Sequence, residues 1–418
     1  MTSSLDEVFH SRCCGLDVHK ETVVACVRIT EPGRRPQHLI RTFATTTRAL
    51  LELGDWLAQE RVAWVAMEST GVYWKPVWNL LEDRLQLMLV NARDIKQVPG
   101  RKTDVKDSQW IAQLLGCGLL KPSFVPPVGQ RELRDLTRGR TSLLQDKARV
   151  ANRLQKILED ANIKLANVAT DVLGVSGRKM IRALIEGKMT PEQIAELAQR
   201  HLRLKIPRLI EALNGQVSKH HRFMLGFLLD QIEHLEQQIT QLDQRIEEVM
   251  SPLEQQAIKM LDDIPGIDHR AAENILAEIG TDMSRFPTAG HLASWAGVCP
   301  GNNQSAGKRR SGKMNDGNRW LKGTLNQSAW AASRRKDSYF QSQFRRISVR
   351  RGVKRAIMAI AHSQLRVCRE LLKNGQCYQD LGHDYFERRD QEKTRKHLVR
   401  RLEKLGYSVA LVEKNNAA

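Results

Sequence analysis

Between Leu225 and Val249, apolar residues alternate steps of three and four along the chain without a break. This 3.5-residue period predicts one long helix with a narrow apolar seam. We favour a coiled coil that dimerises the protein, because so strict a period is narrower than an ordinary core stripe. The alternative is a long amphipathic helix that packs on its own chain. The seam consists of Leu225, Leu228, Ile232, Leu235, Ile239, Leu242, Ile246 and Val249.

The first 125 residues alternate short apolar runs with helical patterns. Such alternation predicts a layered α/β domain. The residues of 98–106 are polar and include a Pro-Gly pair, so a loop is expected there. Strands are expected at residues 13–18, 21–29, 39–45, 62–68 and 85–90, and helices after Thr46 or Thr47, at 72–81 and at about 104–120.

Three prolines, Pro122, Pro126 and Pro127, mark a boundary after which the chain is helical. Pro252 ends the helix that carries the apolar seam. The predicted fold class is therefore α/β plus all-α, in three parts. They are an α/β domain (1–125), a helical and coiled-coil region (126–258), and a mostly helical C-terminal domain (259–418).

The charge of the chain points to its partners. Its 418 residues carry a formal net charge of +19, which favours nucleic acid over an anionic membrane surface. No run approaches the ~20 apolar residues that a membrane span needs. Met1 to Ser11 lacks a signal pattern, so a cytoplasmic location is expected. The seven cysteines form no Cys-x-x-Cys pair, which predicts reduced, mostly buried thiols and no cysteine-ligated zinc.

Four acids stand out by their placement: Asp17, Glu68, Asp104 and Asp107. The first two lie on apolar strands, where an uncompensated charge is costly. The last two are three residues apart and share one helix face. Carboxylates turned toward one sheet would repel each other without a cation, and their hard oxygens suit Mg²⁺ or Mn²⁺. Any one alone is more often structural, and His19 is expected to be a polar neighbour rather than a ligand.

Three segments around these acids carry a family resemblance. GLDVHKET, AMESTGVYW and KTDVKDSQWIA resemble the RuvC-like domain of Piv-type DNA invertases and the related DEDD insertion-sequence transposases, which are bridge-RNA-guided recombinases. The resemblance extends over nearly the whole chain. It implies an RNase H-like fold in which Asp17, Glu68, Asp104 and Asp107 form the DEDD tetrad.

The segment LDDIPGIDHRAAENILAEIG resembles a helix-hairpin-helix, with a Pro-Gly turn between two helices. Backbone N–H groups at Pro265, Gly266 and Ile267, with the start of the next helix, are predicted to hold a DNA phosphate. A plain helical hairpin is the alternative for this segment.

The following segment, WAGVCPGNNQSAGKRRSGKMNDGNRWLK, resembles the transposase motif of the same family. In that motif a Gly-x-x-Pro segment precedes a catalytic serine and a later Gly-Asn pair. The resemblance places Ser305 at the serine position and Gly317-Asn318 at the pair. Ser311 is the second candidate, because Ser311-Gly312 matches the relatives' Ser-Gly more directly.

Basic charge is concentrated around this motif. From Lys308 to Arg355 the chain has fifteen Lys and Arg and two acids, a net charge of +13. Glycines at intervals let the backbone approach a ligand closely. Interleaved aromatic residues are mostly expected in the core, with one or two able to stack on bases. The predicted nucleic-acid contacts nearest the serine are Lys308, Arg309, Arg310 and Lys313.

These features predict a DNA transposase that cuts and rejoins DNA to move or invert a mobile element. The resemblance implies a guide (bridge) RNA, dimers that pair into a tetramer, and a serine that becomes covalently linked to DNA. Two alternatives remain open at this point. One is a RuvC-like junction nuclease that uses metal and no serine, and the other is a nucleic-acid-binding scaffold without activity.

Overall fold

The structure is a computed structural model that describes residues 9–69, 71–92, 95, 107–301, 303–305, 308–312, 314 and 316–411. For residues 303–305, 308–311 and 392–394 only the backbone is described. The chain divides into two compact units, Met1–Pro126 and Pro127–Ala418, here called the first and the second unit. Each is described by itself.

The first unit is built on a mixed five-stranded sheet of order β3-β2-β1-β4-β5. β1 pairs antiparallel with β2, and β2 with β3, while β1–β4 and β4–β5 are parallel. Thr46, one of the two helix starts expected from the sequence, caps α1, because its side chain accepts a hydrogen bond from the N–H of Ala49. The elements are β1 (Arg12–Val18), β2 (Thr22–Ile29), β3 (Gln37–Ala44), α1 (Thr47–Gln59), β4 (Trp64–Glu68), α2 (Trp74–Leu81), β5 (Gln86–Val90) and α4 (Asp107–Gly116).

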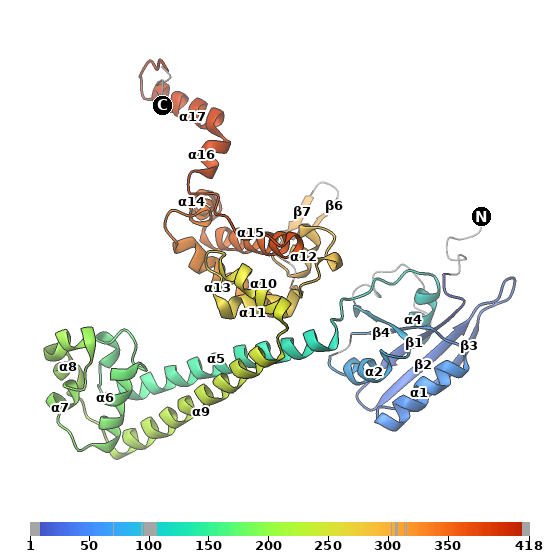
Figure 1. Ribbon diagram of the computed structural model, residues 1–418, viewed down its shortest axis with the longest axis horizontal. Coiled ribbons are helices and arrows are strands. Elements are labelled where there is room, and N and C mark those ends of the chain that lie inside the picture. Colours follow the sequence, from blue (N-terminus) through green and yellow to red (C-terminus); the bar gives the residue numbers. More distant parts are fainter. Residues whose placement is uncertain are drawn as a thin grey trace. The chain divides into compact units, whose positions relative to one another are not determined.

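Helices cover both faces of this sheet (Figure 1). Because successive strand residues point to opposite faces, β1 contributes to two cores. Cys14 and Leu16 pack with α1 and α2. Cys13 packs with Ile111 and Leu114 of α4 on the other face. An α/β first domain is thereby confirmed, and its mixed sheet is consistent with the RNase H-like fold that the resemblance implies.

In its described residues the second unit is almost entirely helical, apart from a short β-hairpin. Its longer helices are α5 (Val128–Asp160), α6 (Val175–Glu186), α8 (Ile206–Leu213), α9 (Lys219–Val249), α10 (Pro252–Asp262), α11 (His269–Ile279), α13 (Arg319–Arg334), α14 (Tyr339–Arg351), α15 (Val353–Asn374) and α17 (Gln391–Lys404). The shorter elements are α7 (Pro191–Ala195), α12 (Ala289–Trp295), α16 (Tyr385–Arg389), β6 (Asn303–Ser305), β7 (Lys308–Ser311) and 3₁₀ turns at Leu165–Asn167, Arg200–Lys205 and Met283–Arg285.

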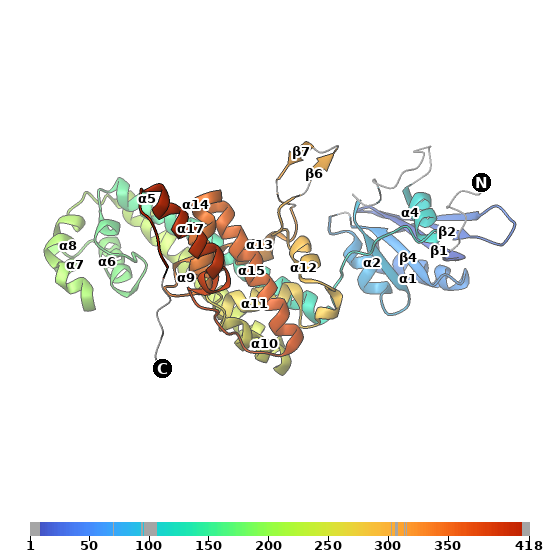
Figure 2. The ribbon, with the colours of Figure 1, turned by 90° about the horizontal axis from the view of Figure 1, so that it is seen from above.

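α5 and α9 lie side by side and antiparallel (Figures 1 and 2). Ion pairs of Lys147 with Glu236 (2.8 Å) and of Arg140 with Asp243 (2.9 Å) show the direction, because the residue number rises on one helix as it falls on the other. The seam of α9 is turned inward. Leu225 and Ile232 are fully buried, in a core shared with α5 and α6.

This packing corrects the interpretation favoured from the heptad period. Within the chain, α5 covers the apolar seam of α9, which is the alternative that the sequence left open. The 3.5-residue period shows that the seam is narrow and regular, but two helices of one chain can form such a seam as well as two chains can. Self-association stays a prediction.

All seven cysteines are free thiols, and four of them are buried. Burial raises the pKa of the Cys13 thiol to about 12 and that of Cys26 to about 11. Such thiols stay protonated and unreactive at neutral pH. Among the helices in the described part of the chain, none has the length and hydropathy to cross a bilayer.

Candidate active site

α4 crosses the sheet directly over Gly15 in β1. A Cβ atom at Gly15 would lie 2.3 Å from the carbonyl oxygen of Ser108 and 2.4 Å from the amide nitrogen of Ala112. Only a residue without a side chain permits so close an approach of helix to strand. Gly15 was missed as a site residue, although a glycine within a strand, two residues before a charged one, is a signal of close backbone approach.

This crossing brings Asp107 to the end of β1 that carries Asp17. α4 runs antiparallel to β1, since Ser108 lies against Gly15 while Ala112 accepts a hydrogen bond from the Cys13 thiol (3.4 Å). Asp107 directly precedes Ser108. Asp17 is on the same face as Gly15, because alternate residues of a strand share a face.

Glu68 joins them from the neighbouring strand. β4 is parallel to β1 with Met67 opposite Leu16, so Glu68 is level with Asp17. It is on the same face as Ala66, which packs in the core under α4. Asp17, Glu68 and Asp107 therefore lie at one end of one face of the sheet.

The carboxylates at this end are accessible to solvent. The side chain of Asp17 is 26% exposed, and its Oδ2 is 3.1 Å from Nε2 of His19. His19 is thus a direct polar neighbour of the predicted site. Asp104, the fourth acid, lies outside the described residues. Among the residues that are described, no group of three or more His, Cys, Asp or Glu side chains is arranged to hold a metal ion.

The two candidate serines lie on the β6–β7 hairpin, which stands away from the helices of the second unit (Figures 1 and 2). Ser305 is the last residue of β6 and pairs with Lys308. Ser311 ends β7 opposite Asn303, with a register shift between Asn303 and Gln304. Ser305 therefore lies beside the turn of the hairpin and Ser311 at its base.

Three of the four phosphate contacts predicted near the serine lie on the hairpin: Lys308, Arg309 and Arg310 are residues of β7. Lys313 lies outside the described residues.

The Pro-Gly turn between α10 and α11 corrects another prediction. Pro265 and Ile267 are buried, and Pro265 has no N–H to donate. The N–H of Ile267 donates to the carbonyl oxygen of Ile264 (3.0 Å), and Gln364 donates to that of Pro265 (2.9 Å). Gly266 lies against the backbone of α13 at Ser328. The turn faces the protein core, so these residues do not form the predicted phosphate site, and the plain helical hairpin is the better description.

Exposed basic side chains instead gather where α14 meets α15. We call this group the basic corner, and all of its members are exposed: Arg345, Arg350, Arg351, Lys354 and Arg355. Of the aromatic residues in the same stretch, Phe340 is fully buried, while Trp330 is 38% exposed.

Comparison with known protein families gives one match in each half of the chain. A family model described as a transposase, of the DEDD type found in IS110 elements, matches residues 14–163. A second, described as "Transposase IS116/IS110/IS902 family", matches residues 258–345. The two models together match more than half of the chain.

The chain belongs to the IS110 family of transposases.

The family assignment predicted from the sequence is thereby confirmed, and a DNA transposase or recombinase is the enzyme class of that family. The first match contains all four acids of the predicted tetrad, and the second contains Ser305 and Gly317-Asn318. The chain is also similar to the pilin gene-inverting proteins of Moraxella bovis and Moraxella lacunata, each 36% identical over 85 residues. These matches span 20% of this chain and 26% of each relative.

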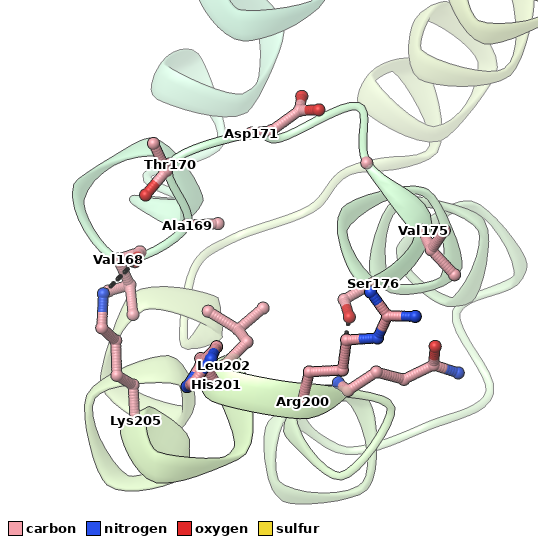
Figure 3. Close-up of a pocket in the computed structure, with 12 residues that line it drawn as sticks. Val168, Ala169, Thr170, Asp171, Val175, Ser176, Arg200, His201, Leu202 and Lys205 are labelled. Carbon is pink, nitrogen blue, oxygen red and sulfur yellow. Dashed lines mark hydrogen bonds between the residues drawn. The ribbon is translucent and has the colours of Figure 1, made fainter.

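A hollow of about 410 Å³ in the second unit is formed by residues that lie, in sequence, between the two matched regions (Figure 3). Its walls are the start of α6 and the 3₁₀ turn Arg200–Lys205. Lys205 lines one side of it, and its Nζ donates to the carbonyl oxygen of Val168 (3.1 Å). The hollow belongs to the second unit and contains none of the predicted site residues.

Proposed function

We propose that this chain is a DNA recombinase that cuts and rejoins DNA to move or invert a mobile element. The observation that carries the proposal is the position of Asp17, Glu68 and Asp107 at the same end of one face of the sheet, where α4 approaches β1 closely at Gly15. That end lies within the segment that matches the DEDD transposase model. The similarity to pilin gene-inverting proteins supports a rearrangement of DNA as the outcome.

The donor set fits a divalent cation. Carboxylate oxygens are the ligands that Mg²⁺ and Mn²⁺ prefer, and we assign them to Asp17, Glu68, Asp104 and Asp107. When bound, such ions polarise the attacking and leaving oxygens of a phosphodiester. His19 holds the Asp17 carboxylate in place through its 3.1 Å contact.

Ser305 is the proposed nucleophile. Its hydroxyl loses a proton as Oγ bonds to the phosphorus, while the bond from phosphorus to one deoxyribose oxygen breaks and that oxygen takes up a proton. A serine needs help to lose its proton, and the segment 301–313 contains no His, Asp or Glu. The carboxylates of the first unit are the source of that help, and we propose that they belong to another protomer. Lys308, Arg309 and Arg310 steady the charge on the phosphate.

The remaining partners follow from the same proposal. DNA is the substrate, an element-encoded guide RNA selects it, and dimers pair into a tetramer. Binding takes place in the cytoplasm, and the basic corner and β7 contact the phosphates. We also propose that the first domain has an RNase H-like fold. The second unit is proposed to divide near residue 258 into a helical region and a C-terminal domain.

The decisive experiment is to react the protein with cognate DNA and guide RNA, digest it, and identify DNA–peptide adducts by mass spectrometry. Adducts on Ser305 are expected, with loss of both adduct and rejoining in Ser305→Ala and retention in the matched control Ser311→Ala. An adduct on Ser311 would assign the nucleophile to the base of the hairpin. Cleavage without any adduct would favour the metal-dependent junction nuclease, and binding without cleavage the scaffold.

A further inference from the structure

Glu278, near the end of α11, is a buried carboxylate with a complete set of partners. It is 2% exposed. Arg138 of α5 binds it in bidentate fashion, with Nε 2.7 Å from Oε1 and Nη2 2.8 Å from Oε2. Arg134, one turn earlier on α5, lies 3.4 Å from the same carboxylate. Glu278 is thus fixed on α5 by charge-assisted hydrogen bonds.

The carboxylate has one further partner, which belongs to the segment after the serine hairpin. The side-chain amide of Asn318 donates to Oε2 of Glu278 at 2.6 Å. The other end of the same side chain caps α13, because Oδ1 accepts from the N–H groups of Trp320 (3.0 Å) and Leu321 (3.2 Å). One asparagine therefore joins the start of α13 to a carboxylate held by α5.

Gly317, the residue before Asn318, closes the base of the segment that contains the hairpin. Gly317 has a positive φ of 54°, and a Cβ there would lie 2.4 Å from the amide nitrogen of Gly297. Gly297 precedes the hairpin and Gly317 follows it, so the two chain ends of the segment meet here. Asn318 adds a backbone hydrogen bond to the carbonyl oxygen of Trp295 (3.3 Å).

We propose that Glu278 is a positioning residue for Ser305: through Asn318 it fixes the base of the serine hairpin on α5, the helix that directly follows the first unit in the chain. The inference rests on the proposed function of Ser305. Glu278 has no need to touch DNA in this role. It sets the place from which the hairpin projects, so that the serine can reach its phosphate.

A second buried ion pair between the same two helices provides a matched control. Arg140 of α5 binds Glu273 of α11 at 2.5 Å and donates to the side-chain oxygen of Asn274 at 3.0 Å. Arg140 is 1% exposed and Glu273 is 3% exposed. These bonds join α5 to α11 directly and do not pass through Asn318. Changes in this cluster should therefore weaken the helix pair without releasing the hairpin.

The test compares Asn318→Asp with Asn274→Ala. Asn318→Asp keeps an oxygen that caps α13, but it replaces the amide donor by a second carboxylate facing Glu278. We expect the single-turnover rate of adduct formation on Ser305 to fall about 100-fold, because small misplacements of reacting groups have effects of that size. Asn274→Ala should leave the rate near that of the wild type. In DNA-free protein, the backbone amides of β6 and β7 should exchange hydrogen faster in Asn318→Asp alone.

In the double variant Asn318→Asp with Glu278→Gln, the amide is at position 278 and the carboxylate at position 318. The hydrogen bond is thereby restored with its direction reversed, and the rate of adduct formation should be at least about tenfold higher than in Asn318→Asp alone. Should Asn318→Asp fold poorly, Asn318→Ser retains a capping oxygen without adding charge. If Asn318→Asp and Asn274→Ala show the same hydrogen exchange in β6 and β7 and the same rate of adduct formation on Ser305, the proposal is overturned. If the wild type forms no Ser305 adduct, the proposed function fails, while hairpin exchange still decides whether Glu278 fixes the hairpin.

Discussion

The two units position their candidate catalytic groups in different ways. In the first unit, Asp17, Glu68 and Asp107 lie on neighbouring regular elements, so the register of β1 with β4 and the crossing of α4 place them at the same end of one face of the sheet. In the second unit, Ser305 lies near the tip of a two-stranded hairpin. A two-stranded hairpin is marginally stable by itself.

This difference shows where each site is vulnerable. A sheet carries its side chains to one edge through backbone pairing, and few specific tertiary bonds are needed. A hairpin needs its base to be held, and here Gly317, Asn318 and the buried Glu278 hold it. The acid site should respond to changes at the acids and at Gly15, whereas the serine should respond to changes far from it.

The largest expected effect is at Asp17. Asp17→Asn removes the charge that a divalent cation needs and should lower the rate of strand cleavage on the order of 1,000-fold, without unfolding the protein. Cleavage rate and the thermal unfolding temperature are measured together, with a chelator as the parallel treatment of the wild type. His19→Gln is the matched control and should have the smaller effect, since His19 only contacts Asp17. Undiminished cleavage in Asp17→Asn would remove this acid from the site.

A stability measurement compares a buried ion pair of the second unit with an exposed ion pair of the first. Glu273→Ala removes the closest carboxylate of the buried Arg140 guanidinium, which keeps Asp243 at 2.9 Å, and should cost about 1.5–3 kcal/mol of unfolding free energy. The exposed pair of Arg48 with Glu52 in the first unit is the control, because such pairs contribute about 0–1 kcal/mol. Denaturant unfolding of Glu273→Ala and Glu52→Ala measures both. Equal losses would show that burial does not distinguish the two pairs.

Gly15→Ala tests the close approach of α4. The added Cβ would meet backbone atoms of α4 at 2.3 and 2.4 Å, so the helix must shift. The expected cost is about 1–3 kcal/mol, accompanied by loss of cleavage because Asp107 moves with the helix. Gly33→Ala is a useful comparison for stability, since nothing lies within 4 Å of a Cβ at Gly33, although its φ of 74° adds some strain. Full cleavage by Gly15→Ala would mean that the site tolerates this shift.

The smallest effect concerns the basic corner. Arg350→Ala and Arg351→Ala should each weaken DNA binding modestly and by the same factor for all sequences. The slope of log affinity against log salt should become shallower by about 1 for each phosphate that is no longer neutralised. Binding is measured by salt titration on cognate and unrelated DNA. Arg48→Ala, on the first unit, serves as the exposed-arginine control. An unchanged salt slope would place the corner outside the DNA interface.

The sequence by itself determined most of the first unit and the family. Short apolar runs identified β1, β2 and β4 to within about two residues, and Thr46 was one of the two expected starts of α1. The placement of Asp17 and Glu68 on strands located the candidate acid site. These features are local, so short stretches of sequence are sufficient to predict them.

Only the tertiary structure decided what covers each apolar or charged face. The seam at Leu225–Val249 was correctly seen as a helix face, yet its partner is α5 of the same chain. The Pro-Gly turn looked like a phosphate site, yet it faces the core. Glu278 resembles any solvated helix acid in sequence, and its burial depends on Arg138, which lies 140 residues earlier. Periodicity and composition report which face is apolar or charged, whereas the partner that satisfies it comes from a distant part of the chain.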